Sequence, residues 1–187
     1  MTDTPTRAAE AAAEILRADG SEAVTMRRIG AHIGLSAMAV YRHYPSREAL
    51  LARVADEWFA RLAAEWAPIL TAPDPIAAGV EEMISLALRE PKVYAFLFLE
   101  ARDGARAVGE LREGRSPTFN LVTGAVAAAM RAGLLREDDP WLVGLAITSH
   151  LHGLIGLHLG GRIGLPDGEF RELCRASLER LIHGIGA

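Results

Sequence analysis

Residues 25–44 constrain the fold of this chain more than any other segment. Two short stretches with the apolar spacing of a helix meet there, and Gly34 separates them. Thr25 precedes the first stretch and Ser36 the second, and both hydroxyls can accept hydrogen bonds from the free N–H groups of a first helical turn. The segment therefore predicts two short helices joined by a tight turn, which is the helix-turn-helix motif.

The residues of this segment suit the close crossing that the motif needs. Gly30 and Gly34 are small enough for two helices to approach, and apolar residues anchor both helices. These apolar residues are Ile29, Ile33, Leu35 and Val40. In such a motif the second helix can lie in the major groove of DNA, with its N-terminal residues near base edges.

Charge is distributed unevenly along the chain. The formal net charge is −4, yet the segment from Thr25 to Arg47 contains four arginines and no Asp or Glu. A local basic patch on an acidic protein is typical of a site for an anionic partner. A solvated basic face is the alternative, and charge alone does not decide between the two.

The remainder of the chain also has the pattern of helices, without period-2 runs or internal repeats. The first helix is expected from Pro5 to Ala18, with Thr4 as its cap. Further helices are expected at about 46–66, 75–89, 91–102, 116–132, 139–160 and 167–183. A loop or frayed helix is expected between Gly104 and Gly114. A proline-rich break after residue 66 predicts two domains, 1–66 and 67–187, in an all-α protein: an N-terminal three-helix DNA-binding domain and a C-terminal helical bundle.

The run from Thr25 to Leu51 resembles the N-terminal domain of TetR-type regulators. That family has a Thr opening the second helix, an Ile-Ala pair, a Gly-Val-Ser turn, an aliphatic-Tyr pair, His-Phe, and Ser-Lys-Glu-x-Leu. The resemblance extends over about residues 6–60. Three positions depart from the pattern: Gly30 stands where Ala is usual, Tyr44 for Phe and Arg47 for Lys.

The resemblance implies which side chains would meet DNA. Thr25, Tyr41, His43 and Arg47 would contact phosphates, which fixes register without reading sequence. Base readout is expected from Arg28, Ala37, Met38 and Arg42, with only apolar contact available to Ala37 and Met38, for instance with thymine methyl groups. The complete set of expected DNA contacts is Thr25, Arg27, Arg28, Ser36, Ala37, Met38, Tyr41, Arg42, His43 and Arg47. Each arginine has a phosphate contact or a solvated side chain as its alternative, and Tyr41 has a place in the core.

The helix expected at 139–160 has two apolar faces, one of them a stripe of small residues. One face can pack on the chain's own core while the other meets a second copy, as TetR-type proteins dimerise through two helices of each chain. A two-fold dimer would place two recognition helices about 34–36 Å apart on a palindromic operator. The expected interface residues are Ala146, Ser149, Gly153, Gly156, Gly160, Phe170, Leu173, Ser177 and Leu181. The pair His152-Gly153 also resembles a C-terminal class with a Trp-His-Gly signature, although Leu151 replaces the Trp.

In the TetR family the C-terminal domain usually binds a small molecule, which shifts the dimer between states that fit DNA and states that do not. The candidate ligand-binding residues are Met83, Tyr94, Phe98, Phe119, Met130, Thr148 and His152, and each has a place in the core as its alternative. The resemblance thus implies a sequence-specific transcriptional regulator: a repressor released by a small hydrophobic effector. The alternative is a helix-turn-helix protein that acts through a protein partner, without an effector.

Other function classes find little support in the sequence. No phosphate loop, nucleophile elbow or dinucleotide fingerprint occurs, so we expect neither an enzyme nor a cofactor. The histidines at 150, 152 and 158 lie two, six and eight residues apart, whereas ligands on one helix need a spacing of three or four, so no metal is expected.

Cys174 is the only cysteine, which fits a reducing cytoplasm. Residues 141–161 lack Asp, Glu, Lys and Arg, but three histidines and five glycines disfavour a membrane span.

Overall fold

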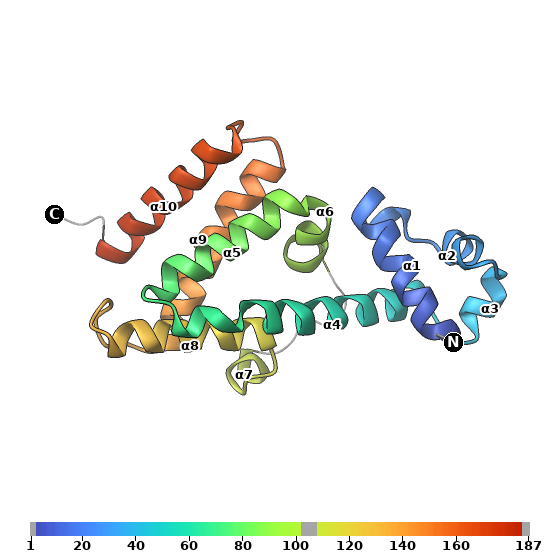
Figure 1. Ribbon diagram of the computed structural model, residues 1–187, viewed down its shortest axis with the longest axis horizontal. Helices are drawn as coiled ribbons and strands as arrows, with labels where there is room; N and C mark the ends of the chain where they lie inside the picture. Colours follow the sequence, from blue (N-terminus) through green and yellow to red (C-terminus); the bar gives the residue numbers. More distant parts are fainter. Residues whose placement is uncertain (1–2, 102–107, 185–187) are drawn as a thin grey trace.

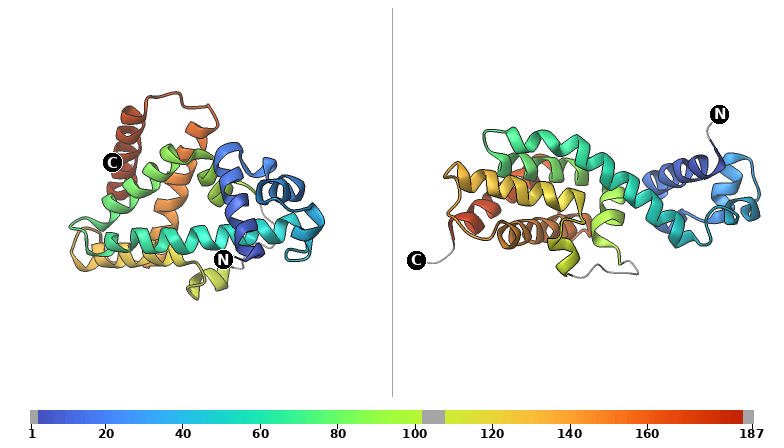
Figure 2. Two further views of the ribbon diagram at one scale, coloured as in Figure 1. Left: turned by 45° about the vertical axis from the view of Figure 1, so that its right-hand side comes forward. Right: turned by 90° about the horizontal axis from the view of Figure 1, so that it is seen from below.

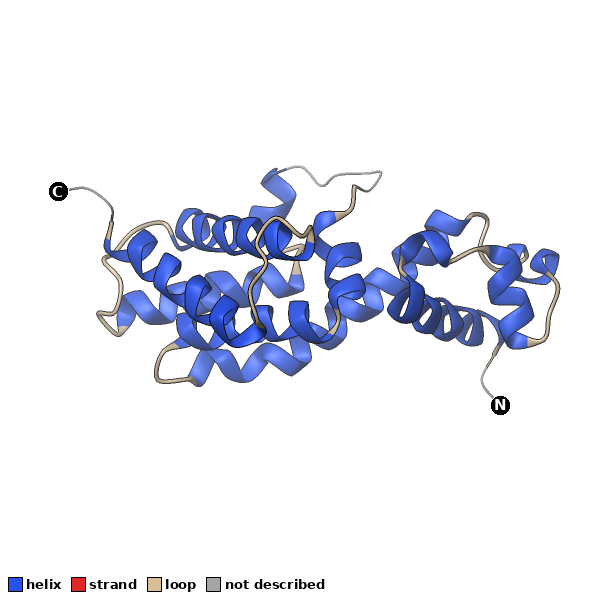
Figure 3. Ribbon diagram, turned by 90° about the horizontal axis from the view of Figure 1, so that it is seen from above, coloured by secondary structure: helices blue, strands red, loops and turns tan. Residues whose placement is uncertain are grey.

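The computed structural model describes residues 3–101 and 108–184, and every regular element in those two ranges is helical (Figure 1, Figure 3). This confirms the predicted all-α fold. A smaller lobe contains the first helices of the chain and a larger lobe contains the later ones, as Figure 3 shows. The long helix α4 (Arg47–Trp66) runs from one lobe into the other.

The smaller lobe is built from α1 (Thr4–Asp19), α2 (Met26–Ile33), α3 (Ala37–Tyr41) and the first turns of α4. A short 3₁₀ turn, η1 (Ser21–Ala23), connects α1 to α2. α1 packs against α2, α3 and α4, and α2 packs against α3. The fully buried side chains at the centre of this lobe are Leu16, Val24, Ile29, Val40 and Leu50.

The larger lobe continues from α4 through a 3₁₀ turn, η2 (Ala67–Thr71). Its helices are α5 (Pro75–Arg89), α6 (Pro91–Tyr94), α7 (Val108–Arg112), α8 (Pro117–Arg131), α9 (Pro140–Leu159) and α10 (Asp167–His183). A π-helical turn, η3 (Ala95–Leu99), extends α6. α8 packs against α4, α5 and α9, while α10 packs on α5 and α9 (Figure 2).

Capping residues set the starts of three helices as expected. The side-chain oxygens of Thr25, Ser36 and Ser46 each accept a hydrogen bond from the backbone N–H three residues later. The expectation for the first helix was wrong by one residue, because Asp3, not Thr4, is its cap. The Asp3 carboxylate accepts from the N–H of Thr6 at 3.0 Å, so Thr4 becomes the first helical residue.

Two other expected helices differ from the structure in length. α3 ends at Tyr41, and a turn leads to Tyr44, whose hydroxyl donates to the Pro5 carbonyl at 3.1 Å. The helix expected at 91–102 ends at Leu99, since Glu100 takes up extended backbone there. The loop or frayed helix expected between Gly104 and Gly114 contains α7; its residues 104–107 lie outside the described ranges.

Candidate nucleic-acid interface and ligand cavity

Gly30 and Gly34 determine how closely α2 and α3 approach. A Cβ atom on Gly30 would lie 2.7 Å from the backbone carbonyl oxygen of Leu35, a distance that real side chains do not tolerate. Gly34 ends α2 with φ of 74°, in the left-handed region that favours glycine. The close crossing expected from the sequence is therefore present, and Gly30 has no space for a side chain.

Side chains that donate to backbone carbonyls hold the motif to the rest of its lobe. Arg7 donates to the carbonyl of Ile33 at the end of α2, at 2.6 Å. Arg47 donates to the carbonyls of Val24 at 2.7 Å and Ser21 at 2.5 Å. Arg47 was expected to contact a phosphate, and in this structure two of its guanidinium nitrogens are already bonded within the protein.

The outer face of α3 is solvent-exposed and combines apolar with basic side chains. Met38 is 68% exposed and Tyr41 is 46% exposed, which excludes the alternative that Tyr41 belongs to the core. Arg42 and His43 are also exposed at the end of the helix, while Ala37 is half-buried. Exposed side chains of these kinds allow α3 to contact bases and phosphates as a recognition helix in a DNA groove.

Two side chains of α2 are directed toward α1. Arg28 forms an ion pair with Asp19, which lowers the pKa of that carboxyl group. His32 lies 2.8 Å from the Glu14 carboxylate. By contrast Arg27 is exposed, and no ion pair is present for it within the described part of the chain. Arg28 would have to leave Asp19 in order to read a base, whereas Arg27 and Arg42 are available without rearrangement.

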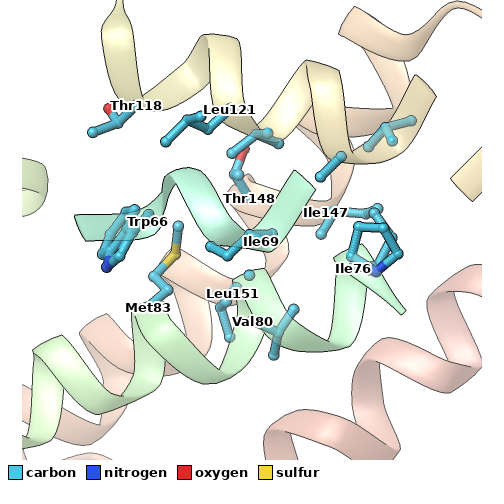
Figure 4. Close-up of a pocket in the computed structure, with 15 residues that line it drawn as sticks. Trp66, Ile69, Ile76, Val80, Met83, Thr118, Leu121, Ile147, Thr148 and Leu151 are labelled. Atoms are coloured by element: carbon cyan, nitrogen blue, oxygen red, sulfur yellow. The ribbon is translucent and has the colours of Figure 1, made fainter. Parts of the chain in front are cut away.

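A cavity lies within the larger lobe, between the end of α4, η2, α5, α8 and α9 (Figure 4). It encloses about 490 Å³ between side chains, including space at its mouth that is open to solvent. Its lining residues are Trp66, Ile69, Pro75, Ile76, Gly79, Val80, Met83, Thr118, Leu121, Val122, Ala125, Val126, Ile147, Thr148 and Leu151. Of the candidate ligand-binding residues, the structure places Met83 and Thr148 in this lining.

Three of the other candidates form a separate aromatic cluster. The Tyr94 hydroxyl lies 2.5 Å from Nδ1 of His152, and the Phe98 ring lies 5.0 Å from both of their rings. Burial lowers the pKa of His152 to about 4 and raises the pKa of Tyr94 far above its usual value. Tyr94 and His152 are therefore both neutral, and one hydrogen bond joins the hydroxyl to the imidazole. These side chains belong to the packed core, outside the cavity.

The last two candidates also lie outside the cavity lining. The Phe119 ring packs edge-on against Trp141, with ring centroids 5.8 Å apart. Met130 is half-buried and packs against the apolar core. Sequence reasoning missed most of the lining, because the residues come from five elements whose meeting point depends on tertiary packing. Among the described residues no group of His, Cys, Asp and Glu is arranged to hold a metal ion.

A set of polar contacts joins the two lobes beside α4. Arg17 of α1 pairs with Glu90 at 3.0 Å and lies over the Trp58 ring of α4. Lys92 of α6 donates to the carbonyl of Ala18. The Ser21 hydroxyl donates to the Glu100 carboxylate at 2.6 Å. The ion pair and the two hydrogen bonds have no local signal in the sequence, since their partners are more than 70 residues apart.

The outer faces of α9 and α10 expose apolar and small residues. Among the helices of the described ranges, α9 alone is long and apolar enough to cross a membrane. An 18-residue stretch of it has a mean hydropathy of 1.4, and 28% of that stretch is buried. Of the expected interface residues, those exposed are Ala146, Ser149, Gly153, Gly160, Leu173 and Leu181. Gly156 and Ser177 are half-buried, and the Ser177 hydroxyl bonds to His150. Phe170 is fully buried beneath His158, so it supports this face from within and cannot itself meet a partner.

The fold and the exposed α3 face are those of a helix-turn-helix regulator with an attached helical body. Residues 9–54 match the family described as "Bacterial regulatory proteins, tetR family", and residues 76–184, more than half of the chain, match "Tetracyclin repressor-like, C-terminal domain". The chain belongs to the TetR family of transcriptional regulators.

Individual relatives are distant in sequence. The nucleoid occlusion factor SlmA of Idiomarina loihiensis is 22% identical over 176 residues, covering 92% of this chain and 84% of its own. A protein of unknown function from Rhodococcus sp. RHA1 has a TM-score of 0.76 at 22% identity, covering 98% of this chain and 97% of its own. FadR of Bacillus subtilis, solved in complex with stearoyl-CoA, has a TM-score of 0.74 at 15% identity and covers 97% of this chain and 99% of its own. At these identities the structures show a shared fold.

Proposed function

We propose that this protein is a sequence-specific DNA-binding repressor. The observation that carries the proposal is the exposed face of α3, where Met38, Tyr41 and Arg42 face solvent in a segment without any acidic residue. Exposed apolar surface next to positive charge suits a DNA groove, where apolar side chains can contact thymine methyl groups and arginines can reach phosphates or bases. The N-terminal domain is assigned to residues 1–66 and the C-terminal domain to residues 67–187.

The protein acts as a homodimer in this proposal. α9 exposes apolar and small residues without a charged side chain, Leu173 and Leu181 are exposed on the adjacent α10, and the small side chains on α9 allow a second copy to approach closely. An apolar helix that is mostly uncovered within its own chain is accounted for by such an interface, so no membrane is required. The setting is the cytoplasm, where the operator lies, and no catalytic activity is assigned.

A small hydrophobic effector releases the repressor from DNA by occupying the cavity. The cavity is lined by helices of the larger lobe, and the contacts of Arg17, Lys92 and Ser21 connect that lobe to the DNA-binding lobe. A ligand that fits one arrangement of these helices better than another shifts the population toward it. FadR, which shares the fold, was solved with stearoyl-CoA, which supports a ligand-binding role for this chain.

Selection of binding sites from a random DNA duplex pool tests the proposal. The expected result is a palindrome whose half-sites are about one helical turn apart, as two recognition helices of a dimer require. Arg42→Ala should weaken binding to the selected site roughly tenfold, whereas the exposed Arg136→Ala, in the other lobe, should leave it unchanged. Binding that shows no sequence preference even at low salt would contradict the proposal and favour a protein partner.

A further inference from the structure

The walls of the cavity contain no ionisable side chain. None of the fifteen lining residues is Asp, Glu, Lys, Arg or His, and apart from the indole N–H of Trp66 the polar groups among their side chains are the hydroxyls of Thr118 and Thr148, each residue 7% exposed. Figure 4 shows both threonines on the cavity wall among aliphatic side chains, with Trp66 and Met83 at one end. A charge that a ligand placed against these walls, away from the open mouth, would be buried without an opposite charge beside it.

The two threonines offer a limited set of hydrogen bonds. The Thr148 hydroxyl donates to the Gly144 carbonyl at 2.8 Å, so its single proton is already used and its oxygen remains as an acceptor. The Thr118 hydroxyl has no hydrogen-bond partner in the described part of the chain. The cavity therefore provides an acceptor at Thr148 and a free hydroxyl at Thr118, which suit an alcohol, phenol, ester or lactone.

The charged groups nearby do not compensate for a buried anion. On α5, Glu81 and Glu82 are next to the lining residues Val80 and Met83 in the sequence. Two arginines of α10, Arg171 and Arg175, lie against α5, but both are bound to Glu81. Burying a carboxylate without a partner is strongly unfavourable, because the hydration that it loses is not replaced.

We propose that the effector of this protein is an uncharged, largely apolar molecule with one hydrogen-bonding group, and that the cavity discriminates against carboxylates and acyl-CoA thioesters. The inference rests on the proposed function, which assigns the cavity to the effector. It separates this chain from FadR, whose structure contains stearoyl-CoA.

Three ligands with the same ten-carbon chain and different charge provide the test: decanol, decanoate and decanoyl-CoA, at pH 8. Calorimetry on the unmodified protein measures each Kd. The Trp58→Phe, Trp141→Phe double variant leaves Trp66 as the single tryptophan, so its emission reports whether the ligand enters the cavity that Trp66 lines. Decanol should shift Trp66 emission and bind at least tenfold more tightly than either charged ligand.

Matched variants determine where the ligand binds. Ala125→Leu adds three carbons inside the cavity and should weaken decanol binding at least tenfold, whereas Ala77→Leu adds the same atoms on the exposed side of α5 and should not. Thr118→Lys places a positive charge at the cavity wall and should improve decanoate binding relative to decanol by tenfold or more. Failure of Thr118→Lys to change this ratio would overturn the inference.

The outcomes separate this inference from the proposed function. Decanoate or decanoyl-CoA binding as tightly as decanol, with all binding lost in Ala125→Leu, would overturn the uncharged class but support the cavity as the effector site. Decanol binding that survives Ala125→Leu, or no Trp66 response to any of the three ligands, would overturn the inference altogether. Operator binding, measured on the same samples without ligand, tests the DNA-binding proposal independently of each of these results.

Discussion

The two lobes of this protein stabilise their helices in different ways. In the smaller lobe, arginine and tyrosine side chains donate to backbone carbonyls, as Arg7 and Arg47 do, and so hold the short helices α2 and α3 in place. α3 has only five residues, too few to be stable as an isolated helix. These anchors therefore set the position of the surface that faces DNA.

The larger lobe relies on long apolar helices that pack over wide surfaces. α5, α8 and α9 each have fifteen or more residues, and they leave between them a cavity with an almost wholly apolar wall. The polar contacts of this lobe include the part-buried Tyr94–His152 hydrogen bond. Hydrogen bonds to backbone carbonyls thus hold the DNA-binding lobe in place, whereas the lobe proposed to bind an effector depends on apolar packing that a ligand can change.

Gly30→Val should disrupt the packing of α2 against the turn before α3 and cause the largest loss of stability. Its Cβ would lie 2.7 Å from the Leu35 carbonyl and 3.0 Å from the backbone of Ser36, so the turn of the motif must move. We expect a loss of roughly 3 kcal/mol in the free energy of unfolding, which is typical of severe overpacking, and a loss of DNA binding. Urea denaturation followed by circular dichroism measures it. Gly109→Val is the control, since no atom lies within 4 Å of a Cβ there. Equal stability of the two variants would contradict the prediction.

The buried His152 should make the larger lobe sensitive to acid. Burial lowers its pKa to about 4, below the value of about 6.5 in an unfolded chain. Between these values the unfolded state binds the proton and the folded state does not, so stability is complete above pH 6.5 and falls as the pH drops toward 4. From pH 7.5 to pH 5 this histidine should account for a loss of about 2 kcal/mol in the free energy of unfolding.

His152→Asn isolates this contribution, because an amide can accept from the Tyr94 hydroxyl and does not titrate. Denaturation of both proteins at pH 7.5 and pH 5 should show the wild type losing more stability than the variant by the stated amount. The same pH dependence in both proteins would show that other groups cause the acid sensitivity.

The sequence predicts features that depend on local residues better than features that depend on how the helices pack. Caps are local signals, so Thr25, Ser36 and Ser46 were identified correctly, and the bounds 75–89 and 167–183 agree with α5 and α10. Contacts between distant segments have no local signal. The cavity lining, the bond between Tyr94 and His152, and the ion pair of Arg28 with Asp19 depend on how helices meet, which residue types along a single helix do not specify.

Arg47→Lys distinguishes an anchor from a phosphate contact in the smaller lobe. Lysine preserves the charge, yet its single ammonium group cannot reproduce the fork that reaches the carbonyls of both Val24 and Ser21. If Arg47 is an anchor, Arg47→Lys should lower the free energy of unfolding by about 1.5 kcal/mol, because one carbonyl loses its hydrogen bond to a charged donor. The salt dependence of DNA binding should remain the same. A variant of unchanged stability would show that the two hydrogen bonds contribute little.

Met38 offers the smallest and most specific effect, at the surface of the reading lobe. Met38 is 68% exposed, so most of its side chain is uncovered by the described part of the chain, and it has only apolar contact to offer a base. Replacing thymine by deoxyuracil in the selected operator removes one methyl group and nothing else. Burial of a methyl group contributes about 0.8 kcal/mol, which corresponds to roughly a fourfold change in Kd. We therefore expect one or two thymines in each half-site to show this loss in a gel-shift titration.

The difference should disappear in Met38→Ala, because the variant no longer covers the methyl group. Operators whose binding is insensitive to deoxyuracil at every thymine would show that Met38 does not read the groove, and base readout would then depend on Arg42 and on Arg28 after release from Asp19.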